Sequence, residues 1–316
     1  MAKVKVSLIT TVLNEEGSIG SFLESVSKQT RVPDEIVIVD GGSTDSTVGK
    51  IKSLKLKVQS YSSKFKILKK RGNRSVGRNE AIKHAKGEVI AVTDVGCVLD
   101  RNWLRNIVKP FENNEIDVVA GFYKPKTGSI FEKCLATYTC TMSDKVQPSE
   151  FLPSSRSVAF RKKVWEQVGG YPEELDTCED LVFDKKLKAA GFKFVFAKNA
   201  IVYWPQRKNI FASARQFFNY AVGDGEALYI RPQTPFLFVR YLVGVFLIIV
   251  YFIMKANLLL SSIYYLVSLY LVWAVLKNYK YIRHPAAFFW LPVLQIVSDA
   301  AVLLGMTIGF LKRLIR

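Results

Sequence analysis

The chain has 316 residues, a formal net charge of +18 at pH 7 and a hydrophobic content of 49%. Its four cysteines show no CxxC spacing, which argues against a disulfide framework and against a zinc site. The positive charge suits an anionic membrane or an anionic substrate, and no nucleic-acid recognition motif accompanies it. We therefore expect no nucleic-acid partner.

The N-terminal part alternates short apolar runs with amphipathic segments, a pattern that predicts a mostly parallel sheet with helical crossovers. Strands are expected at Val4–Thr11, Glu35–Val39, Phe65–Leu68, Val89–Thr93, Val118–Phe122, Ser157–Phe160, Phe192–Ala197 and Ala200–Tyr203. Helices are expected at Ser18–Lys28, from Ser43 onward, and at Ser75–Lys86, Gly128–Met142, Lys162–Val168 and Glu179–Ala190. The elements predict one α/β domain over residues 1–208.

Three long apolar stretches form the C-terminal part, and each approaches the roughly 20 residues that a helix needs to cross a bilayer. They are Phe236–Met254, Leu258–Leu276 and Ala286–Leu311. The third contains Pro292, Gln295 and Asp299, so the sequence leaves open whether it crosses fully or lies partly at the interface. Asp299 either pairs with Arg240 of the first stretch or lines a polar path. Residues 236–316 are predicted to be a membrane domain of about three helices.

Residues 209–235 connect these two parts and mix aromatic with basic side chains. Such a segment beside a membrane is typical of an amphipathic interface helix, although a surface helix packed on the domain has a similar composition. The N-terminus shows no signal-peptide pattern. The loop after the second stretch contains Lys277, Lys280 and Arg283, which the positive-inside rule assigns to the cytoplasm. We expect a multi-pass membrane protein with a cytoplasmic N-terminal domain.

Two predicted strands run directly into an aspartate, at Asp40 and at Asp94. Ligands of parallel sheets bind beyond the carboxyl ends of the strands, so both acids are expected beside a bound nucleotide. One acid suits a contact with the base or ribose, and the other suits a metal ion held against phosphates. Gly41 and Gly42 follow Asp40 and let a ligand approach the backbone closely.

The end of the first strand also carries exposed hydrogen-bonding groups. Thr11 ends the strand, and Leu13, Asn14 and Glu15 follow it at the expected nucleotide edge. A glutamate at the start of a helix also complements the helix dipole, so this segment alone is a weak indication of a ligand.

Two further helix starts carry charged candidates. Arg78 and Asn79 lie in the first turn of the helix after the basic loop, where a guanidinium can bind phosphate or base edges. Glu179 and Asp180 begin a later helix. An acid there either caps the helix or acts as a general base toward an incoming hydroxyl group.

Taken in order, these motifs resemble glycosyltransferase family 2, whose members are inverting nucleotide-sugar transferases of the GT-A fold. The resemblance covers roughly residues 4–204. The matching residues are Thr11-Val12-Leu13-Asn14-Glu15, Asp40-Gly41-Gly42-Ser43-Thr44-Asp45-Ser46-Thr47, Gly77-Arg78-Asn79, Thr93-Asp94, Gly169-Gly170-Tyr171-Pro172 and Glu179-Asp180.

The resemblance implies a nucleoside-diphosphate sugar as donor, with a UDP-sugar favoured and a GDP-sugar as the alternative. It implies a base contact at Asp40 and a metal–diphosphate contact at Asp94 through Mg²⁺ or Mn²⁺. It also implies a catalytic base at Asp180, with Glu179 beside it. The implied nucleotide-binding set is Thr11, Leu13, Asn14, Glu15, Asp40, Arg78 and Asp94. Together with the membrane domain, the family points to a lipid-linked acceptor and to contact with membrane lipids.

The sequence departs from the family pattern at two places. Gly96 stands where a metal-binding Asp-x-Asp motif would have its second acid. Residues 203–207 do not match the Gln-x-x-Arg-Trp motif of processive synthases, which argues against an enzyme that extrudes a polysaccharide. Two other functions stay open at this point. One is a membrane-anchored nucleotide-sugar binding protein without catalysis, and the other is a nucleotidyltransferase.

Overall fold

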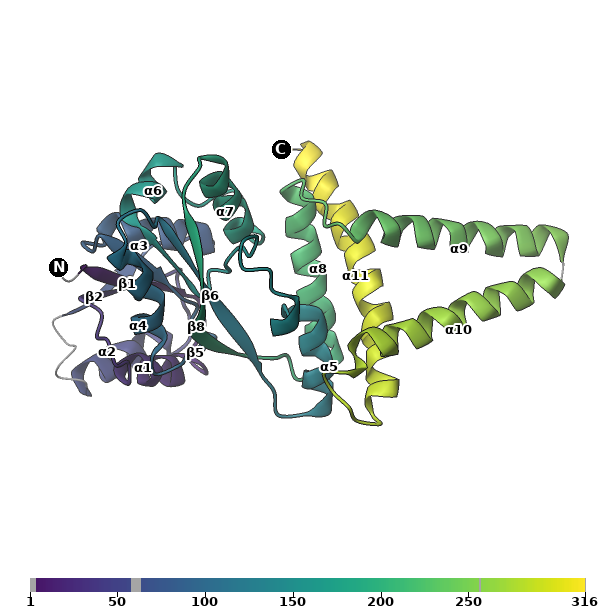
Figure 1. Ribbon diagram of the computed structural model, residues 1–316, viewed down its shortest axis with the longest axis horizontal. Coiled ribbons are helices and arrows are strands. Elements are labelled where there is room, and N and C mark those ends of the chain that lie inside the picture. Colours follow the sequence, from purple (N-terminus) through teal and green to yellow (C-terminus); the bar gives the residue numbers. More distant parts are fainter. Residues whose placement is uncertain (1–3, 58–63, 256, 316) are drawn as a thin grey trace. The chain divides into compact units, whose positions relative to one another are not determined.

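The computed structural model describes residues 4–57, 64–255 and 257–315 (Figure 1). The chain forms two compact units that are interleaved in sequence. The first unit contains Met1–Lys126 and Met142–Pro205, and the second contains Thr127–Thr141 and Gln206–Arg316. Residues 1–3, at the start of the first predicted domain range, and residue 316, at the end of the last one, lie outside the described residues.

The first unit is built on an eight-stranded sheet with the order β3-β2-β1-β4-β7-β6-β8-β5. Strands β1 to β4 pair in parallel, as do β6 and β8, while β7 and β5 run antiparallel to their neighbours. The mostly parallel sheet predicted from the sequence is therefore confirmed. The strands are β1 (Val6–Val12), β2 (Glu35–Asp40), β3 (Phe65–Lys69), β4 (Val89–Val92), β5 (Val98–Leu99), β6 (Val118–Lys126), β7 (Val158–Arg161) and β8 (Phe194–Pro205).

Helices cover both faces of this sheet, so successive strand residues alternate between two apolar clusters. Leu8 and Ile36 belong to the cluster under α1, α2 and α4, whereas Ile9 and Val37 belong to the cluster under α3, α6 and α7. This double burial explains why the strands read as continuous apolar runs. The helices are α1 (Ile19–Ser27), α2 (Thr47–Lys57), α3 (Arg74–His84), α4 (Trp103–Val108), α6 (Lys162–Gln167) and α7 (Glu179–Ala189), with short 3₁₀ turns at Lys109–Glu112 and Ser143–Lys145.

Three details of the first unit differ from the sequence prediction. The two short strands expected at 192–203 form one strand, β8, which pairs with β6 on both sides of an irregularity near Ala120–Phe122. The helix expected from Ser43 begins only at Thr47, because Ser43 and Thr44 form a loop that is hydrogen-bonded to Asn14. Strand β5 and helix α4 were not predicted.

The second unit contains α5 (Ile130–Thr139), α8 (Ile210–Glu226), α9 (Thr234–Met254), α10 (Asn257–Tyr279) and α11 (Ala287–Ile315). Helix α5 lies in a segment that the sequence prediction left in the first domain. Its buried side chains Phe131 and Leu135 pack in one cluster with Leu291 and Leu294 of α11. The Tyr138 hydroxyl also donates a hydrogen bond of 2.8 Å to the Leu291 carbonyl.

Helices α8 and α11 pack against each other through glycine. A Cβ atom placed at Gly309 would lie 2.2 Å from the Val222 carbonyl oxygen, and one at Gly225 would lie 2.6 Å from the Met306 carbonyl oxygen. Only residues without a side chain allow two helix backbones to approach so closely. The connecting segment is thus helical, as expected, and its role as a membrane-interface helix stays a prediction.

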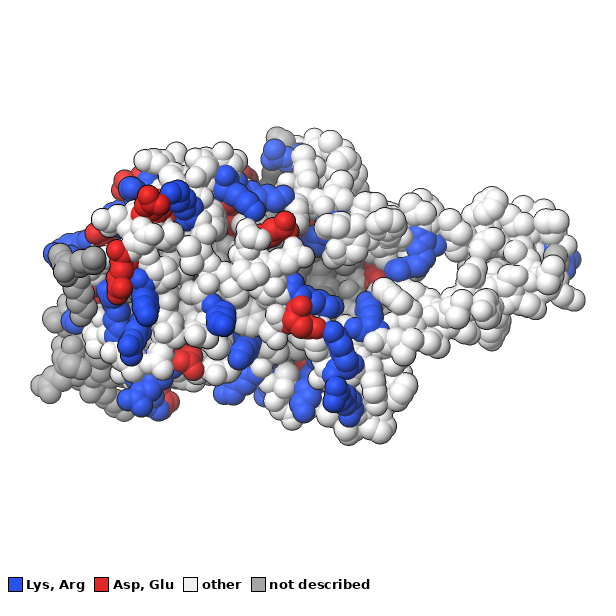
Figure 2. Space-filling view, in the orientation of Figure 1, with Lys and Arg blue, Asp and Glu red and all other residues white. Residues whose placement is uncertain are grey.

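Helices α9, α10 and α11 have 21, 23 and 29 residues and are long and apolar enough to cross a membrane. Many of their large apolar side chains are exposed, including Phe236 at 77% and Leu258 at 82%. Figure 2 shows the α9–α10 hairpin almost free of charged groups. Since contiguous exposed apolar surfaces of this size are rare on proteins in water, they fit a lipid environment. The expected pair of Asp299 and Arg240 is confirmed, with 2.9 Å between Oδ2 and Nη2.

Candidate active site

The predicted site residues gather at the carboxyl edge of the parallel strands. Val12, at the end of β1, is the register partner of Asp40, which ends β2. Asp94 follows β4, the strand that pairs with β1 on its other side. The two acids therefore flank the end of the central strand β1, which is where the sequence analysis expected a nucleotide.

Hydrogen bonds join the loop after β1 to the loop after β2, and they involve residues that the sequence analysis named as candidates. Asn14 has a left-handed backbone, with φ of 54°, and its amide N–H donates a 3.0 Å hydrogen bond to Ser43 Oγ. Its side-chain Oδ1 accepts a 2.9 Å hydrogen bond from the Thr44 amide. The Glu15 amide donates to Thr47 Oγ1 at 2.8 Å. Asn14 and Glu15 thus hold the two loops together, which is a positioning role at the edge of the site.

The remaining residues of this edge are placed differently. Thr11 packs against α3, since a Cβ atom at Gly77 would lie only 2.6 Å from Thr11 Cγ2. Leu13 is 54% exposed and is free to contact a ligand. Asp40 is buried, and its Oδ1 accepts a 3.0 Å hydrogen bond from the Ser43 amide. Asp40 therefore fixes the glycine loop that follows it, and a ligand contact would use its other oxygen.

A buried guanidinium joins three of the predicted residues. Arg78 is only 2% exposed, and its Nη1 donates to Glu179 Oε1 at 2.6 Å. Its Nη2 donates to Asp94 Oδ1 at 2.9 Å. Burial disfavours the charge of Arg78, but Asp94 and Glu179 outweigh that effect and raise its pKa. The sequence separates these residues widely, and the fold brings them together as one charged group.

Positive charge surrounds Asp94. Burial works to raise the pKa of this carboxyl group, but Arg78, Arg156 and Arg74 together hold it below its usual value. The Arg156 guanidinium also lies over the Trp204 ring, 3.9 Å from its centroid. Asp94 is therefore ionised at neutral pH. The surrounding arginines form a basic environment that suits a diphosphate.

The two acids at the start of α7 differ in their burial and in their hydrogen-bond partners. Glu179 is buried and committed to Arg78, and burial raises its pKa despite that partner. Asp180 is half-buried, and its carboxylate accepts hydrogen bonds from two backbone amides, a long one of 3.3 Å from Ser155 to Oδ2 and one of 2.9 Å from Leu181 to Oδ1. Asp180 is therefore the better placed of the two to take a proton from a ligand.

Two residues near this site were missed by the sequence analysis. Asp184 lies one helical turn after Asp180 and is 2% exposed, and its Oδ2 has no hydrogen-bond partner in the described part of the chain. Burial, and then the charge of Asp180, raise the pKa of Asp184 well above its ordinary value. Its i, i+4 spacing from Asp180 was the available signal. Arg156 lies between predicted elements, where no pattern marked it.

Asn79, which the sequence named beside Arg78, has a structural role. Its Oδ1 accepts hydrogen bonds from Trp165 Nε1 at 3.0 Å and from the Tyr171 amide at 2.9 Å. Its Nδ2 donates to the Tyr171 carbonyl at 2.9 Å. These bonds tie α3 to the turn before α7 and leave the amide group no role toward a ligand.

Within the described residues there is no group of three or more His, Cys, Asp or Glu side chains that could hold a metal ion. Asp94 nevertheless fits a single-carboxylate site: its side chain is 28% exposed, and no hydrogen bond in the described part of the chain engages Oδ2. Mg²⁺ is often bound by one or two carboxylates together with substrate phosphates. A Cβ atom at Gly96 would meet nothing within 4 Å, so space for a second acid exists there.

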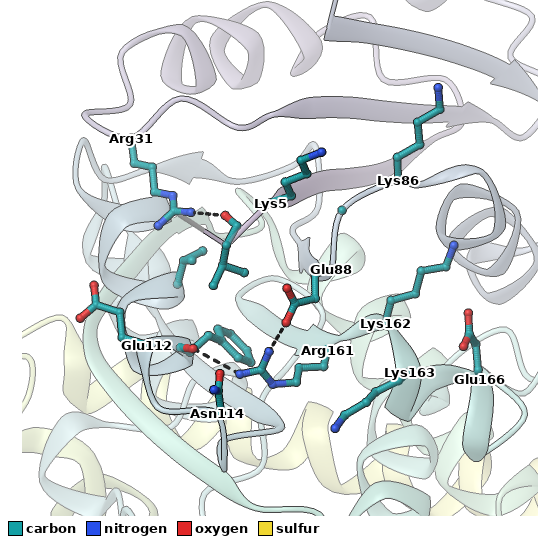
Figure 3. Close-up of a pocket in the computed structure, with 14 residues that line it drawn as sticks. Lys5, Arg31, Lys86, Glu88, Glu112, Asn114, Arg161, Lys162, Lys163 and Glu166 are labelled. Carbon is teal, nitrogen blue, oxygen red and sulfur yellow. Dashed lines mark hydrogen bonds and ion pairs between the residues drawn. The ribbon is translucent and has the colours of Figure 1, made fainter. Parts of the chain in front are cut away.

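A pocket of about 1280 Å³ lies at the opposite edge of the sheet (Figure 3). Lys5 and Glu88 border it, and they precede β1 and β4. Arg161 also borders it, and its guanidinium pairs with Glu88 and donates to the Phe111 carbonyl at 3.2 Å. Because parallel strands bind ligands at their carboxyl ends, this pocket is not the predicted nucleotide site.

Comparison with known proteins identifies the family. The model of glycosyl transferase family 2 matches residues 7–166, just over half of the chain. The chain belongs to glycosyl transferase family 2. The model of glycosyl transferase family group 2 matches residues 89–309, and this second match extends into the apolar helices.

Curated relatives carry glycosyltransferase names. The family 2 chain is 27% identical over 210 residues to Glycosyltransferase AglE of Haloferax volcanii, covering 64% of this chain and 67% of the relative. It is 26% identical over 211 residues to the O-antigen chain rhamnosyltransferase RfbN of Salmonella typhimurium, covering 63% of this chain and 66% of the relative. The match thus spans about two thirds of the length of these relatives.

Solved structures share the fold of the family 2 chain. Mannosyltransferase PcManGT from Pyrobaculum calidifontis, in complex with GDP-Man and Mn²⁺, gives a TM-score of 0.61 at 16% identity and covers 96% of this chain and 88% of that one. S. aureus TarS, residues 1–349 in complex with UDP-GlcNAc, gives a TM-score of 0.52 at 22% identity, with coverages of 69% and 64%. The expected GT-A fold with apolar C-terminal helices is confirmed.

Proposed function

We propose that this chain is a membrane-bound inverting glycosyltransferase that moves a sugar from a nucleoside-diphosphate sugar to a lipid-linked acceptor. The observation that carries the proposal is the Arg78–Asp94–Glu179 cluster at the carboxyl edge of a family 2 sheet, with Asp180 beside it. The charged cluster suits a diphosphate, and Asp180 suits an acceptor hydroxyl group. The three apolar helices support a substrate that resides in the membrane.

The donor end of the proposed site uses the edge formed by β1 and β2. Asp40 is proposed to contact the base or ribose, with Leu13 exposed beside it and with Thr11, Asn14 and Glu15 shaping the loop. Support for a nucleotide sugar comes from the structural neighbours, one bound to UDP-GlcNAc and the other to GDP-Man. We favour a UDP-sugar, and a GDP-sugar is the alternative.

The diphosphate is proposed to lie toward Asp94, where Arg74 and Arg156 add positive charge. A divalent cation, Mg²⁺ or Mn²⁺, would be held there by Asp94 and the phosphate oxygens, and it would neutralise charge on the departing diphosphate. The Mn²⁺ in the PcManGT complex supports a cation in such a fold. Arg78 fixes the Asp94 carboxylate in place through its 2.9 Å hydrogen bond.

The proposed reaction is one displacement at the anomeric carbon. An acceptor oxygen forms a bond to C1 of the sugar as the bond from C1 to the diphosphate oxygen breaks, so the configuration inverts. Asp180 accepts the proton that a hydroxyl acceptor loses. If the acceptor is instead a polyprenyl phosphate, its oxygen is already anionic and no base is needed. Glu179 serves by holding Arg78 rather than by proton transfer.

The proposed orientation keeps the first unit in the cytoplasm, where sugar nucleotides are made. Lys277, Lys280 and Arg283 at the end of α10 and after it then lie on the cytoplasmic side, in agreement with the positive-inside rule. Lys255, at the tip of the α9–α10 hairpin, would lie on the other side. In intact cells, an impermeant thiol reagent should label Lys255→Cys and leave Lys280→Cys unlabelled, with the unsubstituted chain as background.

The activity is tested by incubating membranes that contain the full chain with labelled sugar nucleotides and extracting the lipid phase. We expect label in the lipid phase together with free nucleoside diphosphate. Asp180→Asn should lower the rate of release by roughly 10²–10⁴-fold, while the exposed neighbour Asp176→Asn should leave it unchanged. Release of pyrophosphate would instead identify a nucleotidyltransferase. Binding of the nucleotide sugar without any release would identify a binding protein.

A further inference from the structure

The second unit contains a polar cluster where α9, α10 and α11 meet, and none of its residues is among those proposed for catalysis. Asp299 of α11 lies at its centre and is 4% exposed. Its Oδ2 accepts hydrogen bonds from Arg240 Nη2 at 2.9 Å, from Tyr241 at 3.0 Å and from Tyr270. Its Oδ1 accepts a 2.8 Å hydrogen bond from Gln295 Nε2. Every helix of the trio thus contributes to the binding of one carboxylate.

Lys277 of α10 completes this group, which we call the Asp299 cluster. The Lys277 ammonium donates to Gln295 Oε1 and lies 4.2 Å from the centroid of the Trp273 ring. Arg240 thus pairs directly with Asp299, and Lys277 reaches the same group through the Gln295 side chain. In the sequences of α9, α10 and α11, Asp299 is the single acid.

The cluster also contains a hydrogen-bond donor that is not satisfied. The Nε atom of Arg240 is buried and has no hydrogen-bond acceptor among the described residues. A buried donor without a partner costs free energy. An anion with several acceptor oxygens would remove this cost, and a phosphate group beside Arg240 and Lys277 has this chemistry.

The contacts of α11 locate its two ends relative to α9 and α10. Lys312, near the end of α11, lies 3.5 Å from Glu226 at the end of α8. The chain then turns tightly into α9, because Arg231 pairs with Asp224 through two hydrogen bonds. The C-terminal end of α11 therefore lies beside the start of α9. Its N-terminal part lies beside the end of α10, through Lys277 and Gln295.

Both ends of α11 thus meet the base of the α9–α10 hairpin. With α9 and α10 crossing the bilayer, a helix whose two ends both lie at the base of their hairpin would run along the interface together with α8. This arrangement also puts Lys312 and Arg313 on the same side as Lys277, as the positive-inside rule favours. The Asp299 cluster joins α9 and α10 to α11, and in this arrangement it would lie near the level of the lipid phosphates.

Figure 2 shows an open space between the two legs of the hairpin, with charged side chains gathered at its α11 end. The legs present apolar side chains, such as Phe246, which is 63% exposed, and Leu266, which is 52% exposed. A molecule with a phosphate at one end and hydrocarbon chains at the other matches this distribution of charge and apolar surface.

We propose that the Asp299 cluster binds the phosphate group of a membrane lipid whose hydrocarbon chains lie between α9 and α10. Two sources share this chemistry: a phospholipid that anchors the helices, and a polyprenyl phosphate or diphosphate related to the acceptor. The second source rests on the proposed function, whereas the site itself does not.

The test is lipid binding by the purified full chain in detergent, measured by native mass spectrometry without any sugar nucleotide. Dioleoyl phosphatidate is compared with dioleoylglycerol, and polyprenyl phosphate is compared with polyprenol. We expect each phosphate lipid to bind about tenfold or more tightly than its neutral counterpart. The factor corresponds to one charge-assisted hydrogen bond of about 1.5 kcal/mol.

Substitutions assign the preference to the cluster. Arg240→Gln and Lys277→Gln should each reduce the phosphate preference several-fold, while Lys255→Gln at the hairpin tip should not change it. Asp299→Asn raises the charge of the cluster, so it should keep or strengthen the preference even though it weakens the contacts between the helices. A purely structural ion pair predicts the opposite for Asp299→Asn.

Each outcome is decisive. A stronger preference for phosphatidate identifies an anchoring phospholipid, and a stronger preference for polyprenyl phosphate identifies an acceptor-related lipid. Equal binding of phosphate and neutral lipids, or an equal loss in Lys255→Gln and Lys277→Gln, would overturn the proposal. Because no donor is present, a failed sugar-transfer assay would not affect this result.

Discussion

Replacing Arg78 with glutamine tests whether the charged group at the site stabilises the first unit. The substitution leaves Glu179, which is 4% exposed, without its cation at 2.6 Å. Breaking a buried ion pair by removing one partner costs about 3–5 kcal/mol. Asp94 is 28% exposed and regains part of its hydration, so we take the lower end, about 3 kcal/mol. For a unit of this size that cost lowers the melting temperature by about 6–12 °C.

The pH dependence of this loss has a definite sign. Without Arg78, the folded-state pKa of Glu179 rises further above its unfolded value, because burial then acts unopposed. The stability contribution of such a group is present below the unfolded pKa and is lost as pH rises through the folded pKa. Asp94, whose folded pKa is lowered, also contributes its stability only above its unfolded pKa. The deficit of Arg78→Gln should therefore be larger at pH 8 than at pH 5.

Thermal unfolding of the detergent-solubilised full chain, followed by tryptophan fluorescence, is the measurement. Arg105→Gln is the control, because Arg105 is an exposed arginine in the same unit. The double variant Arg78→Gln, Glu179→Gln should recover part of the loss, since it buries no unpaired carboxylate. Melting of Arg78→Gln within about 2 °C of the control, or a deficit that does not change with pH, would refute this reasoning.

Four further predictions concern the site itself. Asp180→Asn should lower kcat by roughly 10²–10⁴-fold and leave nucleotide affinity unchanged by calorimetry; a small change would indicate a phosphate acceptor. Asp40→Ala should weaken nucleotide binding by about 1–3 kcal/mol, and an unchanged Kd would exclude a direct contact. Gly96→Asp has room for its side chain and should lower the Mn²⁺ concentration needed for half-maximal activity; no change would argue against a cation at Asp94. Arg156→Gln should raise the pKa of Asp94, so the acid limb of cation-dependent nucleotide binding should move to higher pH, and superimposable profiles would contradict this.

The sheet, and the acids at its carboxyl edge, could be predicted because their signals are local. A strand buried on both faces leaves a continuous apolar run, and Asp40 and Asp94 stand out because each follows such a run directly. Parallel strands place their carboxyl ends at one edge, so two acids that are far apart in sequence could be assigned to one site. The acid at the start of α7 was visible for the same kind of local reason.

The partners of these residues could not be predicted, because they depend on packing between distant segments. Arg78 and Glu179 are 101 residues apart, and nothing in either local sequence specifies that they pair. Arg156 lies in an irregular segment and becomes part of the site only through the fold. Asp184 occupies a helix position that resembles a solvent-exposed one in sequence, yet it is buried. The merging of two predicted strands into β8 likewise depends on their common partner, β6.

The position of α5 in the chain has a consequence for the order of events during synthesis. Its Tyr138 hydroxyl bonds to Leu291, which is 153 residues further along the chain. At about 5–20 residues per second, the ribosome needs roughly 8–30 s to supply this partner. The apolar face of α5 must therefore wait, exposed or held by the membrane surface or a chaperone, until α11 has been made. Paired strands of the first unit are closer in sequence, the widest pairing being Val98 with Tyr203, so the final step of assembly for this protein is the arrival of its last helix.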